Sequence, residues 1–259
     1  MTAGTGSLLA LEPAQKAAFE RDGYLVVRGL YSPHEIAEMR ERFNRIVCAP
    51  ETAHKGLRFS YEPAEELAKR PVDPNNPRGV WLIMDTPLAD DYWFDQIREP
   101  RIVNIMGDLL GPDVNFFNGK ARLKPPGYVN RQGWHQDWPY ERHTTPDLAA
   151  AIVYLDDTGP GEGATRVVPG SHRRGEWPHD ERKSIPDEAV EEPGVELVAQ
   201  AGDVAFIHVM VVHRAGDNPS ERSRSAIINE YKSAAAKPLE YQPLAFNELP
   251  LLRGGRRVV

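Results

Sequence analysis

The second half of the chain consists of short apolar segments separated by turn-forming residues. Each segment is rich in Val, Ile, Ala or Phe and is bounded by Gly, Pro or Asp, the pattern of short β-strands. The 23 prolines and 21 glycines fit this interpretation, because many short strands need many turns. We predict strands at residues 114–124, 149–155, 165–168, 195–198, 204–212 and 224–231.

Helices are predicted ahead of these strands, over residues 13–21, 33–47, 92–98 and 101–110. The second begins at a capping box, with Ser32 as the cap, Pro33 at the first helical position and Glu35 two residues later. The first ends at Gly23, since glycine accepts the left-handed conformation that terminates helices. Residues 49–76 are polar and proline-rich, which predicts a long loop.

Helices followed by many strands indicate a mainly β fold, a sandwich or barrel with a layer of N-terminal helices. We expect the 259 residues to form a single domain. Its expected parts are a helical layer at about residues 10–112, a β core at about 113–232 and a C-terminal tail at 233–259 that lies on the domain.

The composition limits the partners of this chain. A net charge of -7 and a pI near 5.7 argue against broad binding to nucleic acid or to an anionic membrane, which both need a basic surface. No apolar run is long enough to span a membrane. The lone cysteine, Cys48, excludes an intrachain disulfide and suits a reducing compartment, so we expect a cytoplasmic protein with a small-molecule partner. The oligomeric state is left open.

His135 and Asp137 form a candidate metal site near the middle of the chain. On a strand, residues two apart share a face, so this imidazole and this carboxylate would converge. A strand-like run over residues 202–213 ends in a further histidine, His213. Two histidines and one carboxylate leave coordination positions open, as in non-haem iron(II) oxygenases. A structural zinc would recruit four protein ligands, often thiolates, and Cys48 is the only cysteine.

His208 is an alternative to His213 as the distal ligand. The odd spacing of these histidines places them on opposite faces of a regular strand, so only one can face the site. We favour His213, because Arg224 follows it at a spacing that suits the next strand.

The sequence resembles the phytanoyl-CoA dioxygenase family of iron(II)- and 2-oxoglutarate-dependent oxygenases. The resemblance rests on four ordered matches that together span most of residues 118–231, and residues 19–24 also look like the opening of the family. The four are Lys124-Pro125-Pro126-Gly127 ahead of Trp134-His135-Gln136-Asp137, the segment from Gly163 to His172, Gly202-Asp203 leading to His213, and Asn218 and Ser220 followed by Arg224.

The resemblance implies a double-stranded β-helix, a jelly-roll, cupin-like barrel with iron(II) inside its mouth, and 2-oxoglutarate and O2 as cosubstrates. It implies His135, Asp137 and His213 as the iron ligands. Arg224 would bind the distal carboxylate of 2-oxoglutarate through its planar guanidinium. Three further residues would hydrogen-bond the cosubstrate: Thr165 at the same carboxylate, and Gln132 and Asn118 nearer the iron.

Two points leave the cosubstrate site open. Arg222 competes with Arg224, although Arg222 follows Pro219-Ser220-Glu221 and can equally be a solvated turn residue. Many members of related families carry a serine two residues after the distal histidine, whereas this chain has Ala215. Because Ala215 has no hydroxyl group, the Thr165 hydroxyl becomes a more important candidate for binding the cosubstrate carboxylate.

The resemblance implies oxidation of a C–H bond in a small molecule, a bacterial specialised metabolite by expectation. Hydroxylation is the default outcome, while oxidative ring closure or desaturation would use the same ligands. One alternative is a cupin-like metalloenzyme that does not use 2-oxoglutarate, such as an isomerase, which would leave Arg224 without a cosubstrate. The other is a non-catalytic barrel that serves as a binding module. Both remain open from the sequence.

Overall fold

The chain folds around two antiparallel β-sheets. In a computed structural model that describes residues 10–69, 72–130, 132–239 and 245–258, the larger sheet has the strand order β1-β8-β5-β10-β4-β11-β12, with β3 also paired to β4 and β2 to β3. The smaller sheet has the order β7-β6-β9. The strands are β1 (Tyr24–Val27), β2 (Arg58–Tyr61), β3 (Val80–Met84), β4 (Val114–Lys124), β5 (Leu148–Tyr154), β6 (Thr165–Val167), β7 (Val195–Glu196), β8 (Val204–His208), β9 (His213–Ala215), β10 (Arg224–Ser233), β11 (Pro250–Arg253) and β12 (Arg256–Arg257).

The helices precede the long strands, as the sequence predicts. The capping box of α2 is present, because Glu35 N–H donates to the Ser32 hydroxyl at 3.3 Å while Ser32 N–H donates to the Glu35 carboxylate at 2.7 Å. The helices are α1 (Pro13–Asp22), α2 (Pro33–Cys48), α3 (Ala64–Leu67), α4 (Asp91–Gln96) and α5 (Pro100–Leu110). Short 3-10 helices lie at Pro50–Thr52, Thr86–Leu88, Trp138–Tyr140, Ser171–Arg174, Asp187–Ala189 and Ala245–Glu248.

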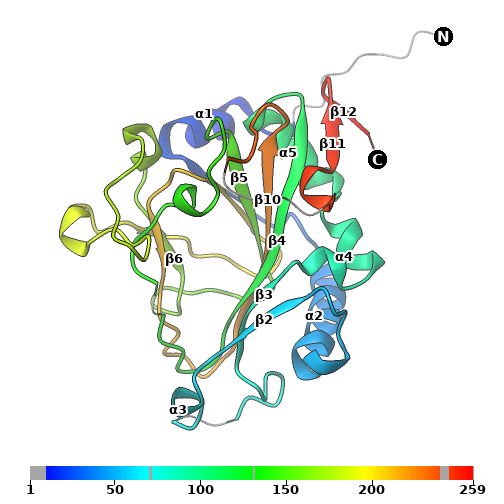
Figure 1. Cartoon of the computed structure of the whole chain (residues 1–259), viewed down its shortest axis with the longest axis vertical. Coiled ribbons are helices and arrows are strands. Elements are labelled where there is room, and N and C mark those ends of the chain that lie inside the picture. Colours follow the sequence, from blue (N-terminus) through cyan, green and yellow to red (C-terminus); the bar gives the residue numbers. More distant parts are fainter. Residues whose placement is uncertain (1–9, 70–71, 131, 240–244, 259) are drawn as a thin grey trace.

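The strands of the larger sheet separate an apolar core from a cavity. Along β10, Ile227 and Tyr231 pack into the main hydrophobic cluster beside the helices, whereas Ala226 and Ile228 line the cavity. This alternation follows from the two-residue period of a strand. Figure 1 shows β4 and β10 lying between β6 of the smaller sheet and the helices α2 and α4. The mainly β fold with N-terminal helices is therefore confirmed.

Two local predictions about strands and loops differ from the structure. Residues 49–76 are not one loop, because β2 pairs with β3 and α3 follows β2. As an edge strand, β2 leaves its side chains exposed or half-buried, so its sequence carries little apolar signal. The run 202–213 is not a single strand either: it divides into β8 on the larger sheet and β9 on the smaller sheet.

The C-terminal segment is more ordered than the predicted tail. β11 adds to the larger sheet beside β4, and the register places Leu252 opposite Val114. Residues 240–244 and 259, which also belong to the predicted tail, lie outside the described residues. The proposed division into three parts of one domain stays a prediction. No described helix combines the length and the apolar character that a membrane crossing requires.

Substitution of Gly202, in the turn before β8, tests the backbone geometry of this turn. Its φ is +96°, and a Cβ there would lie 2.5 Å from the Tyr31 carbonyl oxygen, whereas Gly29 has φ +59° and open space around it. We expect Gly29→Ala to cost about 1 kcal/mol of stability and Gly202→Ala about 2 kcal/mol more, because only Gly202→Ala adds a clash with the backbone. Urea unfolding measures both. Equal losses would contradict this assignment of the turn.

Candidate active site

A backbone pairing between two distant segments brings His135 and His213 together. His135 N–H donates to the His213 carbonyl and His213 N–H donates to the His135 carbonyl, both at 2.9 Å. Side chains of directly opposed residues in antiparallel pairs project from the same face. The two imidazole rings accordingly lie 4.2 Å apart, centroid to centroid.

Asp137 completes the cluster, although not through the strand geometry that the sequence suggested. Its φ of -72° and ψ of -22° are helical, and it precedes the 3-10 helix Trp138–Tyr140, so the strand geometry expected to align His135 and Asp137 is wrong at Asp137. Its N–H donates to the Val209 carbonyl at 3.1 Å. The Asp137 carboxylate still meets both rings, with Oδ1 at 3.8 Å from Nε2 of His135 and Oδ2 at 3.9 Å from Nε2 of His213.

Gln136 points away from this cluster and holds the segment in place. Its buried amide donates to the Met210 carbonyl at 2.7 Å, and its side-chain oxygen accepts from the Trp177 N–H at 2.8 Å. A buried amide with both its donor and its acceptor satisfied has one favoured orientation. Gln136 therefore fixes the position of the two residues on either side of it.

The donor atoms fit a divalent metal ion. Nδ1 of His135 lies 3.0 Å from the Gly133 carbonyl and Nδ1 of His213 lies 2.9 Å from the Val211 carbonyl. Each Nδ1 therefore carries the hydrogen, which leaves the Nε2 lone pair free for a metal. One donor atom from each of the three side chains lies within 4.8 Å of the others, and no other cluster of this kind occurs in the part of the chain that the structure describes.

The electrostatics of the cluster also suit a cation. Burial, and then the neighbouring His213, lower the pKa of His135 to about 3. For Asp137, burial acts to raise the pKa, but His213 and Lys120 outweigh it and lower the pKa below its usual range. At neutral pH His135 is therefore neutral and the Asp137 carboxylate ionised, which are the forms that bind metal.

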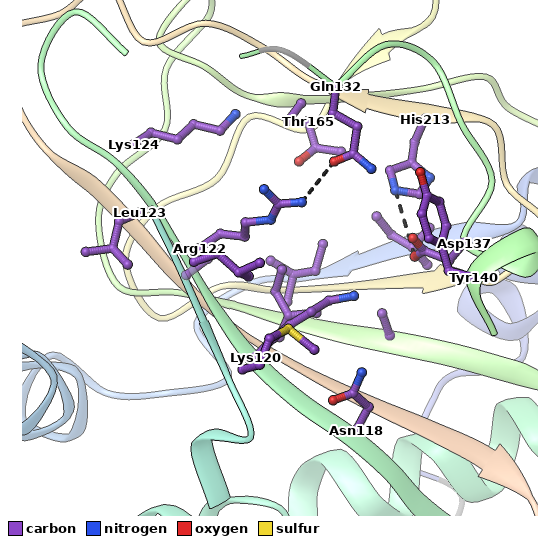
Figure 2. A pocket seen from close by; sticks show the side chains of 18 of the residues that line it. Asn118, Lys120, Arg122, Leu123, Lys124, Gln132, Asp137, Tyr140, Thr165 and His213 are labelled. Carbon is purple, nitrogen blue, oxygen red and sulfur yellow. Dashed lines mark hydrogen bonds and ion pairs between the residues drawn. The ribbon is translucent and has the colours of Figure 1, made fainter. Parts of the chain in front are cut away.

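A cavity of about 450 Å³ opens beside this cluster, between the two sheets. Figure 2 shows four polar side chains of β4 projecting into it one after another: Asn118, Lys120, Arg122 and Lys124. From the smaller sheet, Thr165 of β6 and His213 of β9 reach the same space. The cavity therefore contains all seven candidate site residues of the sequence: His135, Asp137, His213, Arg224, Thr165, Gln132 and Asn118.

Two basic side chains, Arg224 and Lys124, are buried at one end of the cavity. Arg224 donates to the Thr158 hydroxyl and to the Gly163 carbonyl, which Lys124 also contacts at 2.8 Å. Burial, reinforced by the charge of Arg224, lowers the pKa of Lys124 to about 6. At neutral pH Lys124 is therefore largely an uncharged donor, and Arg224 carries the charge. Among the described residues no carboxylate forms an ion pair with Arg224, so this end of the cavity attracts an anion.

Arg222 and His208, the two rivals that the sequence left open, lie outside the cavity. Arg222 is exposed and donates to the Glu162 carboxylate at 3.0 Å, as a solvated turn residue does. The His208 ring packs 5.4 Å from the ring of His172, centroid to centroid. The described lining residues include neither Arg222 nor His208.

The remaining cosubstrate candidates differ in their contacts. The Gln132 side-chain oxygen accepts from Arg122 at 2.9 Å. Thr165 is paired directly opposite Ala215, so its hydroxyl stands beside the position where related families carry a serine. Among the aromatic residues, Tyr140 lines the cavity, whereas Trp93 and Trp177 are buried in separate apolar clusters.

Sequence reasoning missed several polar residues of the cavity. Lys120 and Arg122 lie on the same face of β4 as Asn118 and Lys124, and the alternation of polar and small apolar residues over 118–124 carries this signal. Glu141 has no comparable signal. It reaches the cavity because the chain turns at Trp138–Tyr140.

Two facing sheets with a two-histidine, one-carboxylate cluster and an anion-binding pocket in one cavity define a candidate non-haem oxygenase site. A family model, phytanoyl-CoA dioxygenase (PhyH), matches residues 19–226. The chain belongs to this family, and the family and enzyme class expected from the sequence are confirmed.

Individual relatives agree with this membership. A probable alpha-ketoglutarate-dependent hypophosphite dioxygenase of Stutzerimonas stutzeri is 28% identical over 238 residues, which cover 87% of this chain and 80% of that protein. Two solved structures share the fold. EctD from S. alaskensis with bound Fe has a TM-score of 0.76, 18% identity and coverage of 95% of this chain and 86% of its own. SnoK, a non-heme alpha ketoglutarate dependent carbocyclase from nogalamycin biosynthesis, has a TM-score of 0.71, 20% identity and coverage of 92% and 97%.

Metal content tests the three assigned ligands. We expect His135→Ala and His213→Ala to lose bound iron(II), because each removes one of only three protein donors. His208→Ala serves as the matched control and should retain iron, since its ring lies outside the cavity. Elemental analysis after anaerobic reconstitution and desalting measures this, with circular dichroism to verify folding. Loss of iron in His208→Ala together with retention in His213→Ala would refute the assignment.

Proposed function

We propose that this protein uses iron(II), 2-oxoglutarate and O2 to oxidise a C–H bond of a small organic molecule, of the kind found among bacterial specialised metabolites. One observation carries the proposal: one cavity contains the three metal donors and Arg224, a buried cation that forms no ion pair with a carboxylate among the described residues. The fold likeness to an enzyme of nogalamycin biosynthesis supports the substrate class.

His135, Asp137 and His213 would hold the iron and leave coordination positions for the cosubstrate and O2. The chemistry that iron supplies in this class couples dioxygen reduction to oxidative decarboxylation of 2-oxoglutarate, giving succinate and CO2, while the second oxygen atom serves to oxidise the substrate. The protein fixes the donors through the paired backbone of its two histidines and the locked Gln136.

Arg224 would bind the distal carboxylate of 2-oxoglutarate in two parallel hydrogen bonds, with the Lys124 amine adding a further hydrogen-bond donor. Thr165 is paired opposite Ala215, which has no hydroxyl group. The Thr165 hydroxyl would therefore hydrogen-bond the same carboxylate in its place. Gln132 and Asn118 would contact the end of the cosubstrate nearer the metal. Apolar side chains on the cavity wall, including Ile152 and Ala226, help to exclude water from the reacting groups.

The two alternative functions account less well for Arg224. An isomerase without 2-oxoglutarate, or a non-catalytic binding module, would leave its guanidinium buried without a bound anion. Burial of unpaired charge costs several kcal/mol. An anionic cosubstrate gives Arg224 a function, so we favour the oxygenase. A cytoplasmic location and the absence of nucleic-acid partners stay predictions from composition.

Measurement of 2-oxoglutarate binding distinguishes Arg224 from Arg222 as the residue that binds the distal carboxylate. We expect Arg224→Ala to weaken 2-oxoglutarate binding by about 2 to 4 kcal/mol, roughly 30- to 1,000-fold, because it removes a buried charged partner. Arg222→Ala is the matched control and should bind normally, since Arg222 pairs with Glu162 outside the cavity. Anaerobic titration of the iron-loaded protein measures binding, and succinate formation with iron(II) and ascorbate verifies turnover. Normal binding by Arg224→Ala would move the anchor elsewhere.

A further inference from the structure

Three ionisable side chains from different segments meet away from the Arg224 end of the cavity. Lys120 of β4 forms an ion pair with Glu230 of β10, and its amine lies 3.8 Å from a carboxyl oxygen of Glu141. Glu230 and Glu141 are only 2% and 7% exposed. Lys120 and Glu141 line the cavity, and so does the Asn118 amide. In Figure 2 Lys120 extends from β4 into the cavity, with Asn118 next along the strand.

The position of the cluster formed by Lys120, Glu141 and Glu230 leaves room in the cavity for both 2-oxoglutarate and a substrate. Lys120 precedes Lys124 by four residues on one strand, a separation of about 13 Å at ~3.3 Å per residue. Asp137 is close enough to contribute to the pKa of Lys120. A molecule bound at Lys120 and Glu141 would therefore lie near the metal cluster without occupying the Arg224 end.

A purely structural role explains the cluster poorly. Elsewhere on β10, buried Lys232 shows what a structural ion pair looks like, because its amine contacts the Glu248 carboxylate at 2.7 Å and the Ala236 carbonyl at 2.6 Å. At Lys120, two buried carboxyl groups face one ammonium, and both Lys120 and Glu141 line the cavity. Ionisable groups buried together beside a cavity are common at binding sites.

The charges of the cluster cancel. Burial and the facing Glu230 raise the pKa of Glu141 well above its usual range, so Glu141 keeps its proton at neutral pH. The nearby carboxylates, foremost Glu230, outweigh burial and raise the pKa of Lys120, which stays charged. One ammonium, one carboxylate and one neutral carboxyl group sum to zero. An incoming anion would meet two carboxyl groups, and an incoming cation would meet an ammonium.

We propose that Lys120 and Glu141 bind hydroxyl groups of an uncharged substrate, with Glu230 positioning Lys120. A hydroxyl group both donates and accepts hydrogen bonds, which matches an ammonium donor beside a carboxyl group that does both. The inference rests on the proposed function, because it assigns this part of the cavity to the oxidised molecule. It disfavours phosphates and carboxylates as groups bound here.

Three ring compounds of similar size test this recognition. Cyclohexane-1,2-diol, cyclohexanecarboxylate and cyclohexylamine share a ring that fits the cavity and differ in the charge of the polar group. The protein is loaded with zinc(II), which prevents turnover, and with saturating 2-oxoglutarate, which keeps the carboxylate probe out of the Arg224 end. Ligand-observed NMR then measures binding. We expect the diol to bind about tenfold more tightly than either charged probe.

Variants of Glu141 separate recognition from structure. Glu141→Leu keeps the bulk but removes the hydrogen bonds, and should weaken diol binding about tenfold while 2-oxoglutarate binding stays normal. Glu141→Gln keeps a neutral donor and acceptor, and should retain the diol. Unchanged diol binding in Glu141→Leu would show a structural role and overturn the inference. If Glu141→Leu does not fold, the wild-type ranking decides.

The two proposals fail in different ways. If the wild-type protein binds 2-oxoglutarate normally but binds the carboxylate as tightly as the diol, or binds none of the probes, the substrate inference is wrong and the oxygenase proposal stands. If 2-oxoglutarate does not bind at all, the oxygenase proposal fails first. A diol preference that Glu141→Leu abolishes supports both.

Discussion

The site depends on two reciprocal backbone hydrogen bonds between His135 and His213. Their segments are far apart in sequence and belong to different parts of the β structure, yet this single pairing sets both rings side by side. The Nδ1 contacts to neighbouring carbonyls then fix the tautomers, and the Asp137 N–H bond to Val209 adds the carboxylate. A metal site preorganised by backbone bonds spends little free energy on ordering its donors when the ion arrives.

The cavity is electrostatically divided on either side of this cluster. Arg224 gives one end a positive charge without a carboxylate partner among the described residues, whereas Lys120, Glu230 and protonated Glu141 give the other a balanced charge. One strand, β4, supplies residues to both ends through its two-residue period. Because of this division, an anionic cosubstrate and an uncharged substrate would bind at different ends of the same cavity.

Much of the fold could be predicted from the sequence, because hydrophobic periodicity and the turn and capping residues that bound each element are local signals. The bounds 114–124 match β4, and the capping box at Ser32 marks the start of α2. Nonlocal features were not readable. β2 is an exposed edge strand with little apolar pattern, and the Lys120–Glu230 pair arises from the β4–β10 register. His208 was disfavoured on strand geometry, but the strand ends at His208, and a change of sheet separates it from His213.

X-ray absorption of anaerobic, iron(II)-loaded protein tests the central claim most directly. The account predicts a first shell of nitrogen and oxygen donors that includes two imidazoles and no sulfur, from His135, His213 and Asp137. Addition of 2-oxoglutarate should change this shell, because positions left open by three protein ligands become occupied by the cosubstrate. A shell with a sulfur donor, with one imidazole, or with no response to 2-oxoglutarate would contradict the account.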